Sequence, residues 1–206
     1  MSEPANGSLV RLGAALCLIG ALGSPARAAD AQGQFALEGG GGAKCSAFVE
    51  AHDKRSPEVQ LFLGWIDGYV TAANQLTPET FDLTPWQTGA LLLDFAANYC
   101  RREPEHPFAL AVSRVLGSLA PDRLRAPSTT VALQSGTRTV NLYEEVVRRA
   151  QQALSRRGYD VGTVDGAYGA KTRAAVEKFQ TENRIEANGL LDQRTLFALL
   201  LQRPQQ

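Results

Sequence analysis

Two cysteines place the tightest constraint on how this chain can fold. The sequence holds 3 Cys, and Cys17 lies in an N-terminal apolar stretch typical of a cleavable export signal. Cleavage would leave Cys45 and Cys100 as an even pair in an oxidising compartment, where disulfides persist. Closing a loop of about 55 residues would stabilise the fold by roughly 4 kcal/mol. Two free thiols or one reactive cysteine are the alternative, although no spacing orients His52 or His106 as a base.

The first 28 residues predict a signal peptide. Arg11 supplies the positive charge, Leu12 to Leu22 form the apolar stretch, and Ala26-Arg27-Ala28 is a small-residue cleavage motif. The apolar run is too short to span a bilayer, so we expect no membrane anchor after cleavage, with an uncleaved anchor as the alternative. The mature protein is therefore expected in the periplasm.

Composition divides the remainder into two domains. Four glycines at 39–42 predict a flexible lead-in over 29–43, because ordering glycine costs backbone entropy. We expect a helical domain over 44–119, a Pro- and Ser-containing linker over 120–140 in which 131–133 and 139–140 could be extended, and a second helical domain over 141–206. The predicted fold class is all-α. The net charge is zero, with an acidic front (−5 over 29–120) and a basic back (+4 over 121–206), which argues against a generic nucleic-acid binder.

Four helices are predicted in the front domain from apolar spacing and helix-start residues. They cover about 45–52, 57–75, 84–100 and 107–116, and the third starts at Thr84-Pro85. Gly64, Gly68 and Ala72 form a stripe of small residues that would let another helix approach closely. Trp65 and Tyr69 lie one turn apart and fit either a ligand platform or core packing against the disulfide.

The front domain combines an early cysteine, a Gly-Trp-x-x-Gly-Tyr helix and an Asn-Tyr-Cys segment, in the residues Cys45, Gly64, Trp65, Gly68, Tyr69, Asn98, Tyr99 and Cys100. In these residues it resembles the HdeA-like group of small periplasmic helical proteins with one disulfide. The best-known members of that group are acid-activated chaperones, so the resemblance implies an interaction or stress-related module.

Three helices around glycine-rich turns are predicted in the back domain. The first presents residues from Leu142 to Leu154 on one face and stops at Gly158, the second begins near 170–172, and Asp192 is the N-cap of the third. Glycines at 162, 166 and 169 permit positive φ in the intervening loop, whose amides Asp165 can bind.

A long ordered set of residues in the back domain follows one family pattern: Gln152, Leu154, Gly158, Tyr159, Val164, Asp165, Gly166, Tyr168, Gly169, Thr172, Ala175, Val176, Phe179, Gln180, Gly189, Asp192 and Thr195. In these residues the back domain closely resembles the peptidoglycan-binding domain of bacterial wall enzymes, a compact three-helix module. One departure is Arg184-Ile185-Glu186, where the family more often has a small, Gly-led entry to the last turn.

Five exposed groups around the loop are candidates for contact with peptidoglycan. Tyr159 and Tyr168 could stack on sugar or peptide, and Lys171 or Arg173 could pair with carboxylates. Asp165 could contribute directly, or Asp165 and Tyr168 could merely lock the loop.

The leading hypothesis is a non-catalytic periplasmic protein that docks on peptidoglycan and presents the front domain to a partner such as another envelope protein. No catalytic constellation, metal-ligand set or cofactor motif stands out in the sequence, so we expect no enzyme. The alternatives are an acid-activated chaperone, a wall enzyme, and a wall-hydrolase accessory whose back domain binds a protein.

Overall fold

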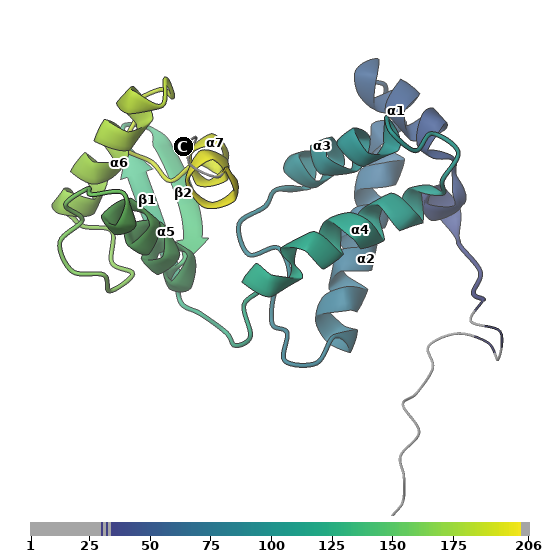
Figure 1. Ribbon diagram of the computed structural model, residues 1–206, viewed down its shortest axis with the longest axis horizontal. Helices are drawn as coiled ribbons and strands as arrows, with labels where there is room; N and C mark the ends of the chain where they lie inside the picture. The colour runs from purple at the N-terminus through teal and green to yellow at the C-terminus, as the bar shows by residue number, and fades with distance from the viewer. Residues whose placement is uncertain (1–29, 31, 33, 203–206) are drawn as a thin grey trace, which may run out of the picture. The chain divides into compact units, whose positions relative to one another are not determined.

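The computed structural model describes residues 30, 32 and 34–202, and the predicted signal peptide lies outside them (Figure 1). From Leu37 onward the described chain forms one compact unit. It contains two hydrophobic clusters, one in each half of the sequence. No helix among the described residues is long and apolar enough to cross a membrane.

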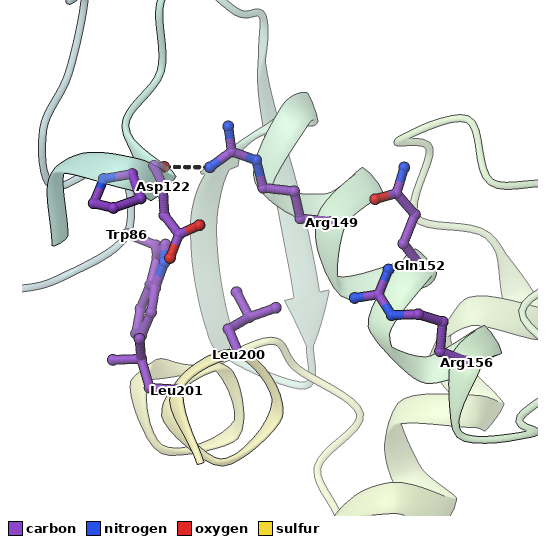
Figure 2. Close-up of a pocket in the computed structure, with 8 residues that line it drawn as sticks. Trp86, Asp122, Arg149, Gln152, Arg156, Leu200 and Leu201 are labelled. Atoms are coloured by element: carbon purple, nitrogen blue, oxygen red, sulfur yellow. Dashed lines mark hydrogen bonds between the residues drawn. The ribbon is translucent and has the colours of Figure 1, made fainter. Parts of the chain in front are cut away.

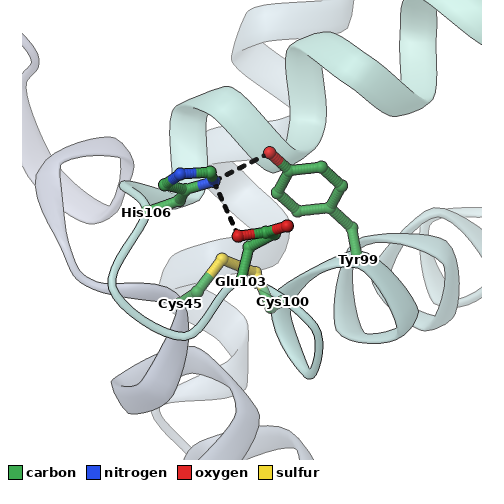
Figure 3. The surroundings of a disulfide bond; sticks show 5 residues. All are labelled: Cys45, Tyr99, Cys100, Glu103 and His106. Carbon is green, nitrogen blue, oxygen red and sulfur yellow. Dashed lines mark hydrogen bonds and ion pairs between the residues drawn. A yellow bond between two sulfur atoms is a disulfide. The ribbon is translucent and has the colours of Figure 1, made fainter.

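Four helices build the N-terminal half, as predicted: α1 (Cys45–Asp53), α2 (Val59–Leu76), α3 (Gly89–Cys100) and α4 (Phe108–Leu119). Their cluster centres on three phenylalanines, with ring centroids 4.5 Å apart for Phe48–Phe108 and 5.0 Å for Phe48–Phe62. The Cys45–Cys100 disulfide is present and fully buried, and it ties the start of α1 to the end of α3 (Figure 3). The pairing predicted from the sequence is therefore confirmed.

The glycine tract is ordered, which differs from the flexible lead-in expected over 29–43. Gly39–Gly42 form a 3₁₀ turn, η1, that packs on α2 and α4. A Cβ on Gly41 would lie 2.3 Å from the Trp65 ring, so only glycine fits there. The indole Nε1 donates to the Glu38 carbonyl at 2.9 Å, which holds the turn against the indole. Tertiary packing thus offsets the backbone entropy that favours disorder in such a tract.

Helix α3 begins at Gly89, five residues after the start that Thr84-Pro85 predicts. Its N-cap is Thr88, whose hydroxyl accepts from the Leu91 N–H at 3.3 Å. Gly89 follows because a Cβ there would lie 2.4 Å from Leu63 Cδ1. The residues before the cap instead carry Trp86 into the C-terminal hydrophobic cluster.

The small-residue stripe on α2 brings no partner close. A Cβ built on Gly64 or Gly68 would meet no atom of the described residues within 4 Å. Trp65 and Tyr69 stack on each other with centroids 5.0 Å apart and pack against the N-terminal cluster, which agrees with the core interpretation.

A β-hairpin opens the C-terminal half, so the all-α prediction is wrong in this region. Strands β1 (Thr130–Ser135) and β2 (Arg138–Tyr143) pair antiparallel, with Leu133 opposite Val140. Leu133 and Leu142 are buried in the C-terminal cluster. Much of the expected linker 120–140, including the short 3₁₀ turn η2 (Ala120–Asp122), is therefore ordered, and Leu142 lies in a strand rather than on the first helix.

Three helical segments pack with the hairpin. They are α5 (Glu144–Arg156), α6 (Ala170–Glu182) and α7 (Gln193–Leu196), which continues as a π-helical turn, η3 (Phe197–Leu201). The Asp192 carboxylate accepts from the Thr195 N–H at 2.9 Å, confirming the predicted N-cap. Arg184 has φ 56°, so an arginine adopts the left-handed backbone at the predicted departure from the family pattern.

Candidate functional site

Two fully buried glutamines hold the loops of the C-terminal half. Gln151 of α5 reaches into the glycine-rich loop, where its Oε1 accepts from the Gly166 N–H at 2.8 Å. Its Nε2 donates to the Ala167 carbonyl at 2.9 Å and to Thr172 Oγ1 at 3.1 Å. Buried polar groups are stabilising only when they are bonded in this way. One carboxamide therefore fixes both the loop and the start of α6.

Gln180 does the same for the loop before α7. Its Oε1 accepts from the Gly189 N–H at 2.9 Å, and its Nε2 donates at 2.9 Å to both the Leu190 carbonyl and Thr195 Oγ1. Gly166 and Gly189 have φ of 85° and 66°, a region that L side chains avoid. Both glycines also lie tight against neighbouring helices, since a Cβ would come 2.8 Å from the Glu144 carbonyl oxygen or 2.6 Å from Glu177 Oε1.

An internal repeat in the sequence underlies this symmetry. An Asp/Asn-Gly pair followed six residues later by threonine occurs twice, as Asp165-Gly166…Thr172 and Asn188-Gly189…Thr195, with 23 residues between equivalent positions. The two glutamines are the elements that join each copy to the helix before it. This repeat is the sequence signal that singles out both threonines as hydrogen-bonding groups.

Asp165, Tyr168 and Arg173 are engaged in contacts within the domain. The Asp165 carboxylate accepts from the Ala167 N–H at 2.9 Å, and this bond lowers the pKa of that carboxyl. The Tyr168 hydroxyl donates to the Gly189 carbonyl, and burial raises its pKa. The Arg173 guanidinium binds the Gln134 carbonyl of β1 and lies 5.8 Å from the Tyr168 ring centroid. Tyr168 and Arg173 are thus brought together, and they join α6 to the hairpin and the second loop.

Lys171 and Tyr159 lie in separate contacts. Lys171 pairs with Asp160 at 3.1 Å, and both side chains are exposed. The Tyr159 hydroxyl bonds to Glu182 at the far end of α6, and its ring packs edge-on against Phe179. Burial, together with the Glu182 carboxylate, raises the pKa of Tyr159 to about 12. Contact between peptidoglycan and any of the five residues stays a prediction. The structure shows that each of the five side chains bonds to another residue of the same half of the chain.

A pocket of about 360 Å³ opens beside α5 and contains none of the five predicted residues (Figure 2). The residues that line it are Trp86, Pro121, Asp122, Arg149, Gln152, Arg156, Leu200 and Leu201. Apolar side chains from the loop before α3 and from η3 form one part of its wall, and polar groups from η2 and α5 form the rest. Sequence reasoning missed it because the pocket depends on Trp86 reaching the C-terminal cluster.

Two of its arginines differ in what they bind. Arg149 is committed to the protein, since it pairs with Glu145 at 2.9 Å and donates to the carbonyls of Asp122 and Arg123. Arg156 lies about two turns further along the same helix. Its guanidinium makes no hydrogen bond or ion pair within the part of the chain that the structure describes. Its charge is therefore available to a ligand.

Comparison with known families gives a match in this half of the chain. Residues 143–199 match the family described as a putative peptidoglycan binding domain. The match runs from the last residue of β2 into η3 and includes both glutamine-bound loops. The HdeA-like resemblance of the N-terminal half is not confirmed and stays a prediction. A search of curated proteins gave no match to the chain.

Proposed function

Starting from the family match at residues 143–199, we propose that this chain is a non-catalytic periplasmic protein that docks on peptidoglycan through its C-terminal half. The disulfide-tied N-terminal half is the module that is presented at the wall, for interaction with an envelope partner or for a stress-related role. The family match over a fold with two pinned loops is the observation that carries the proposal.

The fixed loops support binding to a repeating polymer. Because Gln151 and Gln180 hold the loop backbones in place, little conformational entropy is lost when a ligand binds to them. Each contact with a wall fragment can be weak, since neighbouring sites on the polymer raise the effective concentration of ligand.

A non-catalytic role is supported by how the reactive side chains are used. Cys45 and Cys100 are joined in the disulfide. His52 lies between Asp53 and Asp94, at 3.1 Å and 3.0 Å, and His106 bonds the Tyr99 hydroxyl at 2.9 Å (Figure 3). The cysteines and histidines are therefore bonded to nearby side chains, and they are not arranged around a common position where a substrate could react.

Co-sedimentation with purified sacculi tests the proposal. Residues 29–206 should pellet with sacculi and stay in solution with chitin. A fragment of residues 29–119, which keeps the disulfide but lacks the matched residues 143–199, should stay in solution with both polymers. Failure of residues 29–206 to pellet would overturn wall binding and favour a protein partner. A cleared band on a zymogram with embedded wall material would overturn the non-catalytic role.

A further inference from the structure

We propose that the pocket beside α5 binds a diamino-acid residue of a wall stem peptide, a group that carries both a free ammonium and a free carboxylate. This inference rests on the proposed function and names the chemical class of its ligand. It is carried by one cationic group, one anionic group and an apolar surface that line a single pocket (Figure 2).

The cationic side of the pocket is Arg156. Its guanidinium has no hydrogen-bond partner within the described chain, and it lines the pocket from the C-terminal end of α5. Arginine offers a planar set of donors that matches a carboxylate in a bidentate pair. Gln152, one turn earlier and also lining the pocket, can donate to the same ligand. Arg149 is saturated by its own contacts and shapes the wall instead.

The anionic side of the pocket is Asp122 of η2. Figure 2 shows its carboxylate on the opposite side of the pocket from the Arg156 guanidinium. The Asp122 carboxylate accepts no hydrogen bond from any described residue, and Asp122 and Arg156 form no ion pair with each other. Two opposite charges that face one pocket without pairing favour a ligand that places an ammonium against one and a carboxylate against the other.

Apolar side chains separate these two charges. Trp86, 8% exposed, and Leu200 and Leu201 of η3 line the same pocket. They suit the methylene chain that joins the charged ends of a diamino acid, since apolar surface is buried without leaving a polar group unpaired. A volume of about 360 Å³ is near the lower end for small-ligand sites, which fits one residue of a peptide rather than an extended glycan.

Calorimetric titration of residues 29–206 tests the assignment with a defined probe. The probe is a synthetic stem tripeptide that ends in lysine with a free side-chain amine and a free carboxylate, compared with its amine-acetylated and carboxamide forms. Acetylation should weaken binding to the unmodified protein about tenfold and should have no further effect on Asp122→Asn. Conversion of the carboxylate to a carboxamide should likewise weaken binding to the unmodified protein about tenfold, and it should have no further effect on Arg156→Gln.

Arg114→Gln serves as the matched control. Arg114 is an exposed arginine on α4 that does not line this pocket, so its loss should leave the affinity for the tripeptide unchanged. Equal affinity of Asp122→Asn, Arg156→Gln and the unmodified protein for the tripeptide would overturn the assignment.

The sacculus assay separates this inference from the proposed function. If residues 29–206 pellet with sacculi but do not bind the tripeptide, the pocket assignment is wrong and wall binding stands. If they neither pellet nor bind the tripeptide, both are wrong. Binding of the tripeptide that depends on Asp122 and Arg156, together with weaker pelleting of both variants, would establish the pocket as the wall site.

Discussion

The two halves of this protein are held together by different chemistry. In the N-terminal half a buried disulfide joins α1 to α3 over a cluster of phenylalanines. The C-terminal half has no cysteine, and there two buried carboxamides, from Gln151 and Gln180, bind the loop backbones. A covalent link depends on an oxidising compartment, whereas a hydrogen-bonded carboxamide does not. The hydrogen bonds that hold the loops of the C-terminal half are therefore independent of the redox state on which the disulfide depends.

Removal of the disulfide should have the largest effect on stability, and that effect should be confined to the N-terminal half. Cys45→Ala with Cys100→Ala is expected to lower the free energy of unfolding by about 4 kcal/mol, because the unfolded chain regains the entropy of a long loop. Hydrogen exchange should show lost protection over α1–α4 and retained protection over α5–α7. Reduced unmodified protein is the control, and an equal loss of protection in both halves would contradict the comparison.

Loss of one carboxamide should have the next largest effect, in the other half. Gln180→Ala leaves the buried Gly189 N–H, Leu190 carbonyl and Thr195 hydroxyl without this partner, at a cost of about 2–4 kcal/mol. Urea unfolding followed by circular dichroism measures it. Gln152→Ala is the control on α5, and the half-exposed Gln152 should cost less than about 0.5 kcal/mol. Similar costs for the two variants would show that the carboxamide does not stabilise the loop.

Two glycines should respond to alanine with opposite signs. Gly166→Ala places a Cβ against Glu144 at a φ of 85° and is expected to destabilise by about 1–3 kcal/mol. Gly64→Ala, in the interior of α2 with open space around its Cβ, should stabilise by about 0.5–1 kcal/mol. Thermal unfolding of both variants checks the signs. Stabilisation by Gly166→Ala would mean that the loop adopts another backbone in solution.

The smallest effect should be a loss of stability in acid at the Asp192 cap. Burial alone would raise the pKa of Asp192, but hydrogen bonds from Thr195 and Asn188 outweigh it and lower that pKa. A carboxyl with a lowered folded-state pKa contributes stability above its unfolded pKa of 3.8, and that contribution is lost as pH falls through the folded pKa. Unfolding free energies of the unmodified protein and Asp192→Asn should therefore converge in acid. A gap that persists at low pH would contradict the sign.

The sequence predicts most helices and the disulfide well. The helices follow from local apolar spacing, and the disulfide follows because only two cysteines remain after the predicted cleavage. Apolar periodicity locates α1, α2, α4, α5 and α6 to within a few residues, and Cys45 had one available partner. Extended segments were expected at 131–133 and 139–140, but their pairing into a hairpin was not predicted, because β1 and β2 together bury only Leu133 and Leu142. The start of α3 was misplaced because Trp86 packs into a distant cluster, a tertiary preference that overrides the Thr84-Pro85 signal.

The candidate site was harder to predict than the fold. Their chemistry suggested Tyr168 and Arg173 as ligand contacts, yet both donate hydrogen bonds within the domain. The carbonyls that accept these bonds belong to Gly189 and Gln134, which lie in other segments of the chain, so no local sequence pattern predicts them. The pocket that joins Asp122 to Arg156 brings together η2, α5 and η3, and no spacing along the chain encodes that arrangement.

The placement of the indoles gives each half its own optical reporter. The chain has two tryptophans: Trp65 packs with the N-terminal cluster, and Trp86 packs with the C-terminal cluster and lines the pocket. A Trp65→Phe variant would emit from Trp86 alone, so its fluorescence would follow both unfolding of the C-terminal half and occupancy of the pocket. A Trp86→Phe variant would follow the disulfide-tied half, and neither measurement would need an added dye.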